Sequence, residues 1–348
     1  MTVRVGVIGL RFGGQVHVPA FRTDQRCEVI ALAGRDPGKA AAAARELNVP
    51  ASFEDWRELV KAPDIDAVSI AVPPAAQPAI VIEAARHGKH VFCEKPLAAS
   101  PLDAEEALRA ARNAAIVHGI DFTFPEIAAW RQARALIAEG AIGQVAHFAY
   151  SWRVETHASR TNADTWKNRP VEGGGVLGNF VSHVFFNIEW LLGRIAGFDS
   201  IVCPSGRRTG RAVDGVVRLE NGAAGSLSVS SDAFLGSGHA LEIYGDQGTL
   251  VLNNPTADYA SGFRVHLGTR TSGRLTCVSE TEDSAVEIDG RLAPVTALVR
   301  RFLDAIDGGA AMTPDLADGL RVQQLLALAE AAGNSTGRDA RSHAALTP

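Results

Sequence analysis

Glycines near the N-terminus have the spacing of a loop that binds phosphate groups. Gly9 follows the apolar run 3–8, and Gly14 lies where the next amphipathic stretch begins. Aligned to the dinucleotide motif GxGxxG, Gly9 would allow the tight turn and Gly14 the close packing of helix on strand. Backbone amides at the start of such a helix bind phosphate. The pattern therefore predicts a pyrophosphate site, with a purely structural strand–helix turn as the alternative.

The middle glycine position of this motif holds Arg11. Bare backbone normally approaches the pyrophosphate at that position, so the guanidinium either adds positive charge or obstructs the site. The residues of this loop that we expect to contact a cofactor are Gly9, Arg11, Phe12, Gly13 and Gly14.

The end of the second apolar run, 29–33, bears on which dinucleotide binds. Proteins that bind NAD usually place an Asp or Glu there for the ribose hydroxyls, whereas this chain has Gly34 followed by Arg35. Without the carboxylate a 2′-phosphate is not repelled, and a guanidinium can pair with it in a bidentate way. Arg35 and Lys39 therefore favour NADP over NAD. The alternative is that Arg35 is solvated and that Asp36 caps the next helix.

A Glu-Lys-Pro corner, residues 94–96, follows the buried run 90–93. Ligands of parallel α/β folds bind at the carboxyl ends of the strands, so Lys95 would lie where a substrate hydroxyl could bind. Its ammonium group could orient that hydroxyl and ease its deprotonation. Taken alone, an exposed lysine in a turn is the simpler interpretation.

Short apolar runs alternate with amphipathic stretches over the N-terminal third of the chain. Nearly continuous apolar runs are typical of strands covered on both faces, as in a parallel sheet. Their alternation with helices predicts a doubly wound α/β domain. Ser100 would cap one helix, with Pro101 at its first position. The expected strands are 3–8, 29–33, 67–72, 90–93 and 117–122, and the expected helices are 39–47, 78–87 and 101–113.

The pattern changes after residue 120. We therefore predict two domains, a Rossmann domain at 1–121 and an α+β domain at 122–348 with a large, open and mostly antiparallel sheet. Asn221-Gly222 is a hairpin signal within that sheet. The closing helices, within 294–332, could pack back on the first domain. The expected elements are a helix at 128–139, mostly strands from 143 to 252, a helix at 180–192 and closing helices at 294–306 and 316–332.

The composition of the 348 residues is that of an ordinary globular chain. Hydrophobic residues make up 46% and charged residues 21%, which excludes a disordered chain, and the net charge of −5 argues against nucleic-acid binding. No apolar run approaches the roughly 18 residues that a membrane span needs. No zinc pattern is present, so no metal is expected. The cysteines lie far apart, which predicts reduced thiols and a cytoplasmic protein; they are Cys27, Cys93, Cys203 and Cys277.

Taken together, these segments resemble the Gfo/Idh/MocA oxidoreductases, the family of glucose–fructose oxidoreductase and inositol dehydrogenase. The resemblance runs almost from end to end of the chain. Its most specific part is Gly-Lys-His-Val-Phe-Cys-Glu-Lys-Pro-Leu, residues 88–97. The other matching segments are the glycine loop with His17, residues 64–74, residues 140–145, Trp166-Lys167, residues 173–175, His183 and the closing helices.

The resemblance implies a Rossmann domain followed by a domain whose exposed sheet face forms a homodimer or homotetramer contact. The activity that it implies is reversible hydride transfer between NADP or NAD and the carbinol carbon of a sugar, polyol or related alcohol or ketone, without a metal. Gln77 stands where the family often has His. The residues then expected to line the cofactor are Pro73, Pro74, Gln77, Glu94 and Lys95.

A second-domain stretch of the family, GGGxLxDxGxH, matches residues 173–183. Its aspartate position holds Asn179, and its histidine is retained as His183. An imidazole that titrates near neutral pH suits proton exchange with a hydroxyl, so the resemblance implies that His183 is the acid/base and that Lys95 bonds the same oxygen. Asn179 lies four residues earlier on the same helix face and could position the substrate. Trp166 is expected near the substrate as well.

Two other functions stay open at this point. Arg11 and Asn179 depart from the family pattern, as they would in a cofactor-binding regulator without catalysis, although such a sensor needs neither Lys95 nor His183. The second alternative is a glycosidase or lyase whose bound NAD is reduced and reoxidised within each turnover.

Overall fold

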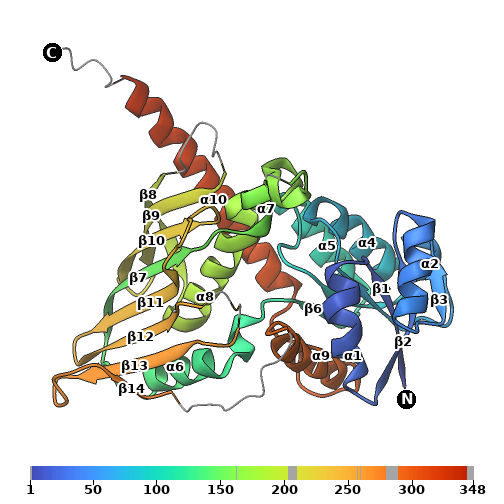
Figure 1. The fold of residues 1–348 in the computed structure, drawn as a ribbon, viewed down its shortest axis with the longest axis horizontal. Coiled ribbons are helices and arrows are strands. Elements are labelled where there is room, and N and C mark those ends of the chain that lie inside the picture. The colour runs from blue at the N-terminus through green and yellow to red at the C-terminus, as the bar shows by residue number, and fades with distance from the viewer. Residues whose placement is uncertain are drawn as a thin grey trace. The chain divides into compact units, whose positions relative to one another are not determined.

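The computed structural model describes residues 2–161, 163–202, 210–256, 258, 260–279 and 289–342. The chain divides into two compact units (Figure 1). Unit 1 comprises Met1–Glu126 and Glu287–Gln323, and unit 2 comprises Ile127–Val286 and Gln324–Pro348. The first unit therefore includes a stretch from near the C-terminal end in addition to the N-terminal residues.

Unit 1 is built on a six-stranded sheet of order β3-β2-β1-β4-β5-β6. Its pairings are all parallel, and the order reverses between β1 and β4, which is the arrangement of a doubly wound dinucleotide-binding fold. The predicted fold class is confirmed for this unit, and the short, partly exposed β3 is an addition to it. The strands are β1 Val3–Ile8, β2 Cys27–Ala33, β3 Ala51–Phe53, β4 Ala67–Ile70, β5 His90–Cys93 and β6 His118–Ile120.

Some helices of unit 1 begin at residues whose side chains cap them. The Ser100 hydroxyl accepts a hydrogen bond from the Asp103 amide (3.2 Å), and Pro101 is the first helical residue, as predicted. Asp36 caps the helix Pro37–Glu46 in the same way, by accepting a hydrogen bond from the Lys39 amide (3.1 Å). The helices are α1 Val18–Arg22, α2 Pro37–Glu46, α3 Trp56–Lys61, α4 Gln77–Arg86, α5 Pro101–Asn113 and α9 Leu292–Ile306.

Aromatic side chains join α1, β5 and α9 in the core of unit 1. The ring centroid of Phe92 on β5 lies 5.9 Å from that of Phe21 on α1 and 5.7 Å from that of Phe302 on α9. All three side chains are fully buried. Because edge-to-face and tilted ring pairs add to the free energy gained by burial, α9 is an integral part of this core although it lies far along the chain.

Unit 2 is built on an eight-stranded sheet of order β14-β13-β12-β11-β7-β10-β9-β8. The described strands pair in antiparallel fashion except β7 with β10. The predicted open, mostly antiparallel sheet is confirmed, and it continues beyond residue 252. The strands are β7 Val145–Arg153, β8 Ile195–Val202, β9 Ala212–Leu219, β10 Ala224–Ser230, β11 Gly238–Gly245, β12 Gly248–Asn254, β13 Arg264–Thr269 and β14 Thr276–Cys277.

One face of this sheet is buried. Along β7 the side chains of Phe148, Tyr150 and Trp152 are buried, whereas His147 and Arg153 on the alternate positions are exposed. Helices α6 and α8 lie against the sheet in Figure 1. The helices of this unit are α6 Ala128–Ala138, α7 His157–Thr161 and α8 Ser182–Leu192, and α10 Leu316–Ser342 begins in unit 1 and continues into unit 2.

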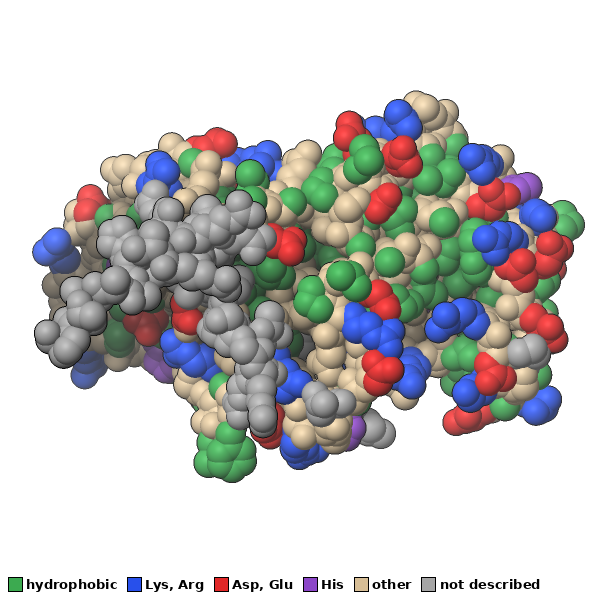
Figure 2. Space-filling model, turned by 90° about the horizontal axis from the view of Figure 1, so that it is seen from above, with side chains coloured by type: hydrophobic (Ala, Val, Ile, Leu, Met, Phe, Trp, Pro, Cys, Tyr) green, Lys and Arg blue, Asp and Glu red, His purple; other side chains and the backbone are tan. Residues whose placement is uncertain are grey.

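Lys and Arg side chains are interspersed with Asp and Glu over the face drawn in Figure 2, so no large field of one sign gathers on its described residues. Among the described helices none is long and apolar enough to cross a bilayer. Cys27 and Cys93 are buried free thiols and Cys277 is an exposed one. Cys203 lies outside the described residues.

Candidate active site

Gly9 occupies the turn that leads out of β1. Its φ of +118° belongs to the region that favours glycine, and a Cβ there would overlap the carbonyl oxygen of Ala71 at the end of β4. The Gly9 amide donates to Ala33 at the end of β2 (3.0 Å), and the Ala71 amide donates to Ile8 (2.8 Å). The turn is therefore held between the carboxyl ends of the two neighbouring strands, where the expected pyrophosphate would bind.

The close helix–strand contact is made by Gly13, and the prediction that Gly14 makes it is wrong. A Cβ on Gly13 would lie 2.9 Å from a methyl carbon of Val7 on β1, whereas a Cβ on Gly14 would meet only Leu47, at 3.3 Å. The reason is a π-helical turn, η1, at Gly13–His17, which changes the rotation of the first turn. Its wider turn aims Gly13 rather than Gly14 at the strand.

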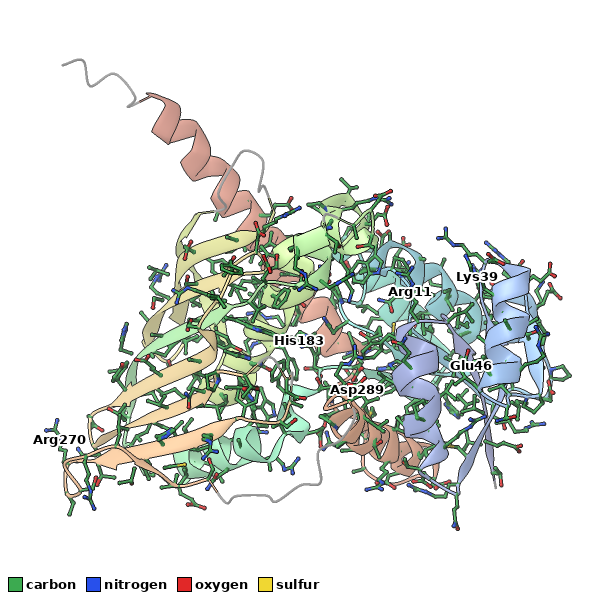
Figure 3. All side chains as sticks on the ribbon, in the orientation of Figure 1. Arg11, Lys39, Glu46, His183, Arg270 and Asp289 are labelled. Atoms are coloured by element: carbon green, nitrogen blue, oxygen red, sulfur yellow. The ribbon has the colours of Figure 1, made fainter. Side chains whose placement is uncertain are left out.

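The amide groups that precede Gln15 lie at the N-terminus of this helix. Gln15 donates its amide to the Arg11 carbonyl (2.8 Å), so the helical bonding begins at Arg11, and amides before Gln15 lack partners within the helix. Arg11 is exposed and Phe12 half-buried. Arg11 and Lys39 both lie toward the upper end of unit 1 in Figure 3. Free amides beside a guanidinium fit a dinucleotide pyrophosphate.

Gly34 occupies the position that carries an acid in many NAD proteins. A Cβ there would lie 2.6 Å from the Leu10 side chain, so an acidic residue at this position would have to displace that side chain. Arg35 is exposed. The Lys39 ammonium pairs with Asp36 (3.1 Å), which also caps α2. Of the two predicted cations, Arg35 is the one whose charge is not already paired with Asp36.

Gln77, expected to line the cofactor, is fully buried and holds the Glu-Lys-Pro corner. Its amide nitrogen donates to the carbonyls of Glu94 (3.0 Å) and Pro96 (2.6 Å), and its oxygen accepts from the Cys93 thiol (3.2 Å). Gln77 follows the turn η2, Pro74–Ala76, which begins after Pro73. Its side chain therefore determines the path of the backbone on both sides of Lys95.

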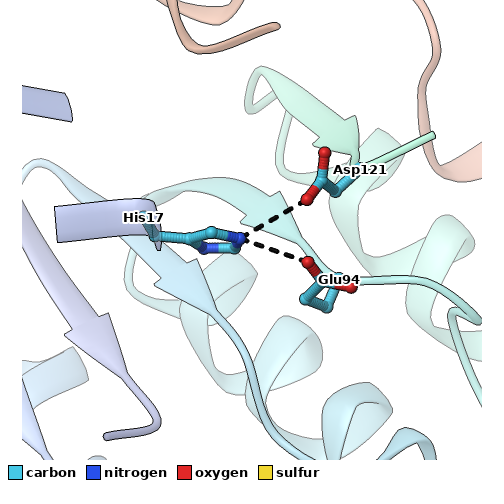
Figure 4. Close-up of side chains that lie close together, drawn as sticks. All are labelled: His17, Glu94 and Asp121. Atoms are coloured by element: carbon cyan, nitrogen blue, oxygen red, sulfur yellow. Dashed lines mark hydrogen bonds and ion pairs between the residues drawn. The ribbon is translucent and has the colours of Figure 1, made fainter. Parts of the chain in front are cut away.

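His17 joins three neighbouring strands, and Figure 4 shows its contacts with Glu94 and Asp121. Its Nδ1 lies 2.7 Å from the hydroxyl of Ser69 on β4. Its Nε2 lies 3.2 Å from a carboxylate oxygen of Glu94, which follows β5, and 3.5 Å from one of Asp121, which follows β6. We call His17, Glu94 and Asp121 the His17 cluster. Lys95 is half-buried beside it, and its backbone amide donates to Glu94 (3.2 Å).

The charges of the His17 cluster depend on one another. Burial opposes the charge of His17, but hydrogen bonds with Asp121 and Glu94 raise the pKa of its imidazole to about 9. Burial and the neighbouring Glu94 raise the pKa of Asp121 to about 7, against the effect of His17. Burial also opposes the charge of Glu94, yet His17 and Asp121 hold the pKa of Glu94 below its usual value.

Within the described residues, the His17 cluster is the one group of three histidine or acidic ligand atoms that lie within 4.8 Å of one another. Its nitrogen–oxygen separations are those of hydrogen bonds and ion pairs, and a proton on Nε2 accounts for them. Sequence reasoning missed Ser69 and Asp121. The signal is a polar residue within or directly after a buried strand, because such a residue must find a partner.

In unit 2, His183 lies on α8 and is 3% exposed. Figure 3 labels it among the side chains of this unit. Its ring centroid is 6.1 Å from that of Trp152, which stacks on His239 at 4.3 Å. His239 also bonds the buried Tyr150 hydroxyl (2.6 Å), and burial lowers the pKa of His239 to about 3. The Trp152 ring next to His183 is therefore backed by an uncharged pair, His239 and Tyr150.

Asn179 lies on the π-helical turn η6, Leu177–Val181, directly before α8. Its amide nitrogen donates to the carbonyls of Lys167 (2.9 Å) and Gly175 (2.9 Å). A Cβ on Gly174 would overlap the carbonyl of Trp166, so the glycine run packs against the segment that carries this half-buried tryptophan. Asn179 thus brings the predicted substrate residues of unit 2 into one neighbourhood.

Comparison with known proteins agrees with this architecture. Residues 3–122 match the family model described as "Oxidoreductase family, NAD-binding Rossmann fold", and residues 130–251 match the "GFO/IDH/MocA C-terminal domain". The chain is 32% identical to the oxidoreductase sll0816 of Synechocystis over 94% of its own length and 93% of that protein.

Two named dehydrogenases are also similar. Levoglucosan dehydrogenase of Pseudarthrobacter phenanthrenivorans is 27% identical, with 92% of this chain and 93% of that protein covered. Inositol 2-dehydrogenase of Burkholderia cenocepacia is 26% identical, with 92% and 90% covered. The solved structure of levoglucosan dehydrogenase in complex with NADH superposes with a TM-score of 0.84 at 25% identity, covering 96% of this chain and 98% of that one.

The doubly wound sheet and its glycine turn define an oxidoreductase that uses a pyridine dinucleotide. The chain belongs to the Gfo/Idh/MocA family of these enzymes.

Proposed function

We propose that the enzyme transfers a hydride between NADP and the carbinol carbon of a sugar, polyol or related alcohol or ketone, with NAD as the second choice of cofactor. The observation that carries the proposal is the position of Lys95. It follows β5, at the edge of the sheet where ligands bind, on a corner held by Gln77 and Glu94. The names of levoglucosan dehydrogenase and inositol 2-dehydrogenase support the substrate class.

Lys95 donates a hydrogen bond to the reacting oxygen. Its positive charge stabilises the developing alkoxide when an alcohol is oxidised, and polarises the carbonyl in the reverse direction. When bound, a pyridine dinucleotide supplies the acceptor or donor of the hydride. A held corner suits this role because a donor placed in advance costs little reorganisation at the moment of reaction.

His183 exchanges the proton of the same hydroxyl group. An imidazole is suited to this near neutral pH. Asn179 cannot carry charge; it holds the turn before α8 by donating to Lys167 and Gly175, and it orients the substrate. Trp166 contributes an apolar surface for the substrate beside this turn.

The assay is the change in absorbance at 340 nm across a panel of sugars, anhydrosugars and polyols, with NADP and with NAD. Turnover of at least one polyol or sugar is the expected result. His183→Gln should lower kcat by about a hundredfold or more, whereas His87→Gln, a matched change on the surface of unit 1, should leave it unaltered. Unchanged turnover in His183→Gln would remove His183 from the mechanism.

A cofactor-binding regulator is the second candidate, and one observation favours it. Asn179 replaces the family aspartate and directs its amide to backbone carbonyls, so this position offers no acid or base. Tight binding of the dinucleotide without turnover of any substrate in the panel would select this candidate.

The open face of the unit 2 sheet supports a homodimer or homotetramer. Val216 on β9 and Tyr244 on β11 are 37% and 36% exposed on strands whose alternate residues are buried. Such a face buries apolar side chains when a second copy covers it. Light scattering after gel filtration should give at least twice the monomer mass, and Val216→Asp should reduce it. A monomeric wild type would contradict this assembly.

The buried free thiols Cys27 and Cys93 support a cytoplasmic location.

A further inference from the structure

The His17 cluster occupies one particular half of the unit 1 sheet. Its carboxylates follow β5 and β6, and its imidazole bonds Ser69 on β4, which are three adjacent strands on one side of the point where strand order reverses. Doubly wound folds consist of two mononucleotide-binding halves, and the glycine turn with β1, β2 and β3 forms the other half. Under the proposed function, the β4-β5-β6 half would therefore receive the nicotinamide nucleotide.

One oxygen of the cluster is left without a hydrogen bond. Oδ1 of Asp121 is buried and has no hydrogen-bond partner among the described residues, whereas Oδ2 lies near His17. Asp121 is 2% exposed, so solvent does not stabilise its charge. An ionised carboxylate in such a place is stabilised strongly by any further positive charge that comes near it.

Among the titratable groups in and around the His17 cluster, Asp121 is the one whose charge changes near neutral pH. His17 is protonated and Glu94 ionised near neutral pH, as their pKa shifts indicate. The Cys93 thiol stays neutral because burial raises its pKa. Lys95 carries the remaining nearby charge, on the same corner as Glu94.

Helix α9, which packs on η1 and β5, carries Arg301 and the exposed Arg300, and Arg291 lies directly before it. Arg301 pairs with Glu126 (2.8 Å), and Arg291 pairs with Asp289 (2.6 Å) while it lies over the Phe12 ring. The inward side chain of α9 at this place is the apolar Phe302. The net charge of the His17 cluster thus changes from zero to −1 when Asp121 loses its proton.

We propose that the His17 cluster selects the redox form of the cofactor: with Asp121 ionised it favours the oxidised, positively charged nicotinamide, and with Asp121 protonated it distinguishes the two forms much less. This inference rests on the proposed function, because it requires the nicotinamide to bind over the β4-β5-β6 half. Lys95 alone cannot supply the effect, since its positive charge repels the oxidised ring. The cluster supplies the negative charge that offsets this repulsion.

The sign of the pH dependence follows from linkage. If ionised Asp121 binds the oxidised ring better, then the oxidised cofactor favours ionised Asp121 by the same factor. The affinity ratio of oxidised to reduced cofactor should therefore rise with pH through about 7, the pKa of Asp121 in the free protein. A rise of roughly tenfold lies within the usual range of coupling between two sites.

The test is calorimetric titration of the full chain with NADP⁺ and with NADPH, at half-unit steps between about pH 5.5 and 8.5. The wild-type ratio of affinities should rise roughly tenfold. Asp121→Asn should make it independent of pH. Asp64→Asn, an exposed carboxylate on unit 1, is the matched control and should retain the wild-type rise. Circular dichroism checks the fold of each variant.

A second variant keeps the inference testable if Asp121→Asn does not fold. His17→Gln removes the cation that favours ionised Asp121, so the rise should move to higher pH. A flat ratio in the wild type, or a rise retained in Asp121→Asn, would overturn the inference while the proposed function stands. A rise that requires added divalent cation and disappears with a chelator would also overturn it. Failure to bind either redox form would overturn the proposed function itself.

Discussion

The imidazole Nδ1 of His17 lies 2.7 Å from the hydroxyl of Ser69, and both side chains are fully buried. This bond connects the helix that follows the glycine turn to the middle of the parallel sheet. The opposite ring nitrogen reaches Glu94 of the Glu-Lys-Pro corner (3.2 Å). One side chain therefore links the loop expected to hold the pyrophosphate to the corner that carries Lys95.

His17→Ala should destabilise unit 1 by about 3–5 kcal/mol, because it leaves two buried carboxylates without their cation. Urea denaturation followed by circular dichroism measures the free energy of unfolding. His87→Ala is the control: that histidine is partly exposed, and its one ion pair among the described residues is with Glu83, so its loss should cost at most about 0.5 kcal/mol. Equal effects of the two substitutions would contradict the buried network.

The stability of the protein should fall as the pH rises from neutral to alkaline. The pKa of His17 is about 9 in the folded chain and 6.5 in its ordinary state, so its contribution is complete below 6.5 and is lost as the pH passes 9. Asp121, with a pKa of about 7 against 3.8, favours the folded state most when protonated and loses that contribution between these values. The pKa of Glu94 is lowered in the folded chain, so the contribution of Glu94 to stability is instead lost when the pH falls in the acid range.

Denaturation curves at pH 6, 7.5 and 9 would measure this fall. His17→Gln should remove most of the decrease between the last two, and Asp121→Asn should remove the part below neutral pH. A wild-type free energy of unfolding that is constant over this range would show that the folded His17 does not hold its proton.

Lys95→Met should lower kcat by about two to four orders of magnitude without weakening the binding of the cofactor. The reason is that the ammonium acts on the reacting oxygen, whereas the methionine keeps most of the side-chain volume. Lys61→Met, on the exposed surface of α3, is the control. Steady-state kinetics and calorimetry separate the two effects, and an active Lys95→Met enzyme would remove this residue from the mechanism.

Arg35→Ala should weaken NADP roughly tenfold or more, since a charged hydrogen bond contributes about 1.5–3 kcal/mol, and should leave NAD nearly unchanged. Only NADP carries the phosphate that Arg35 would bind. Arg57→Ala, an exposed arginine of α3 that pairs with Asp55, is the control. If the affinities for both cofactors fall together, the preference for NADP is wrong.

Gly13→Ala should be more destabilising than Gly14→Ala, although the motif assigns the packing role to Gly14. The added methyl group would lie 2.9 Å from Val7 in the first case and 3.3 Å from Leu47 in the second. Val7 is a fully buried strand residue and cannot move away easily, whereas Leu47 is only partly buried. Thermal unfolding of the two variants decides the order.

Local patterns in the sequence were sufficient to predict most elements of both units, although not β3, α3 or α7. Continuous apolar runs such as 3–8 and 90–93 mark strands covered on both faces, and Ser100 and Asp36 cap the helices that follow them. The turn at Gly9 and the family resemblance were also readable, because each depends on residues close together in the chain. The sequence by itself thus determined the fold class and the kind of cofactor.

The tertiary structure alone decided which side chains meet. His17 is 52 residues from Ser69 and 77 from Glu94, so their contact depends on the order of β4, β5 and β6 and on the π-helical turn that orients the imidazole. Within the same turn, Gly13 rather than Gly14 makes the close contact with the strand. Burial then set the charges, since the pKa of Asp121 follows from its neighbours and the loss of solvent rather than from its residue type.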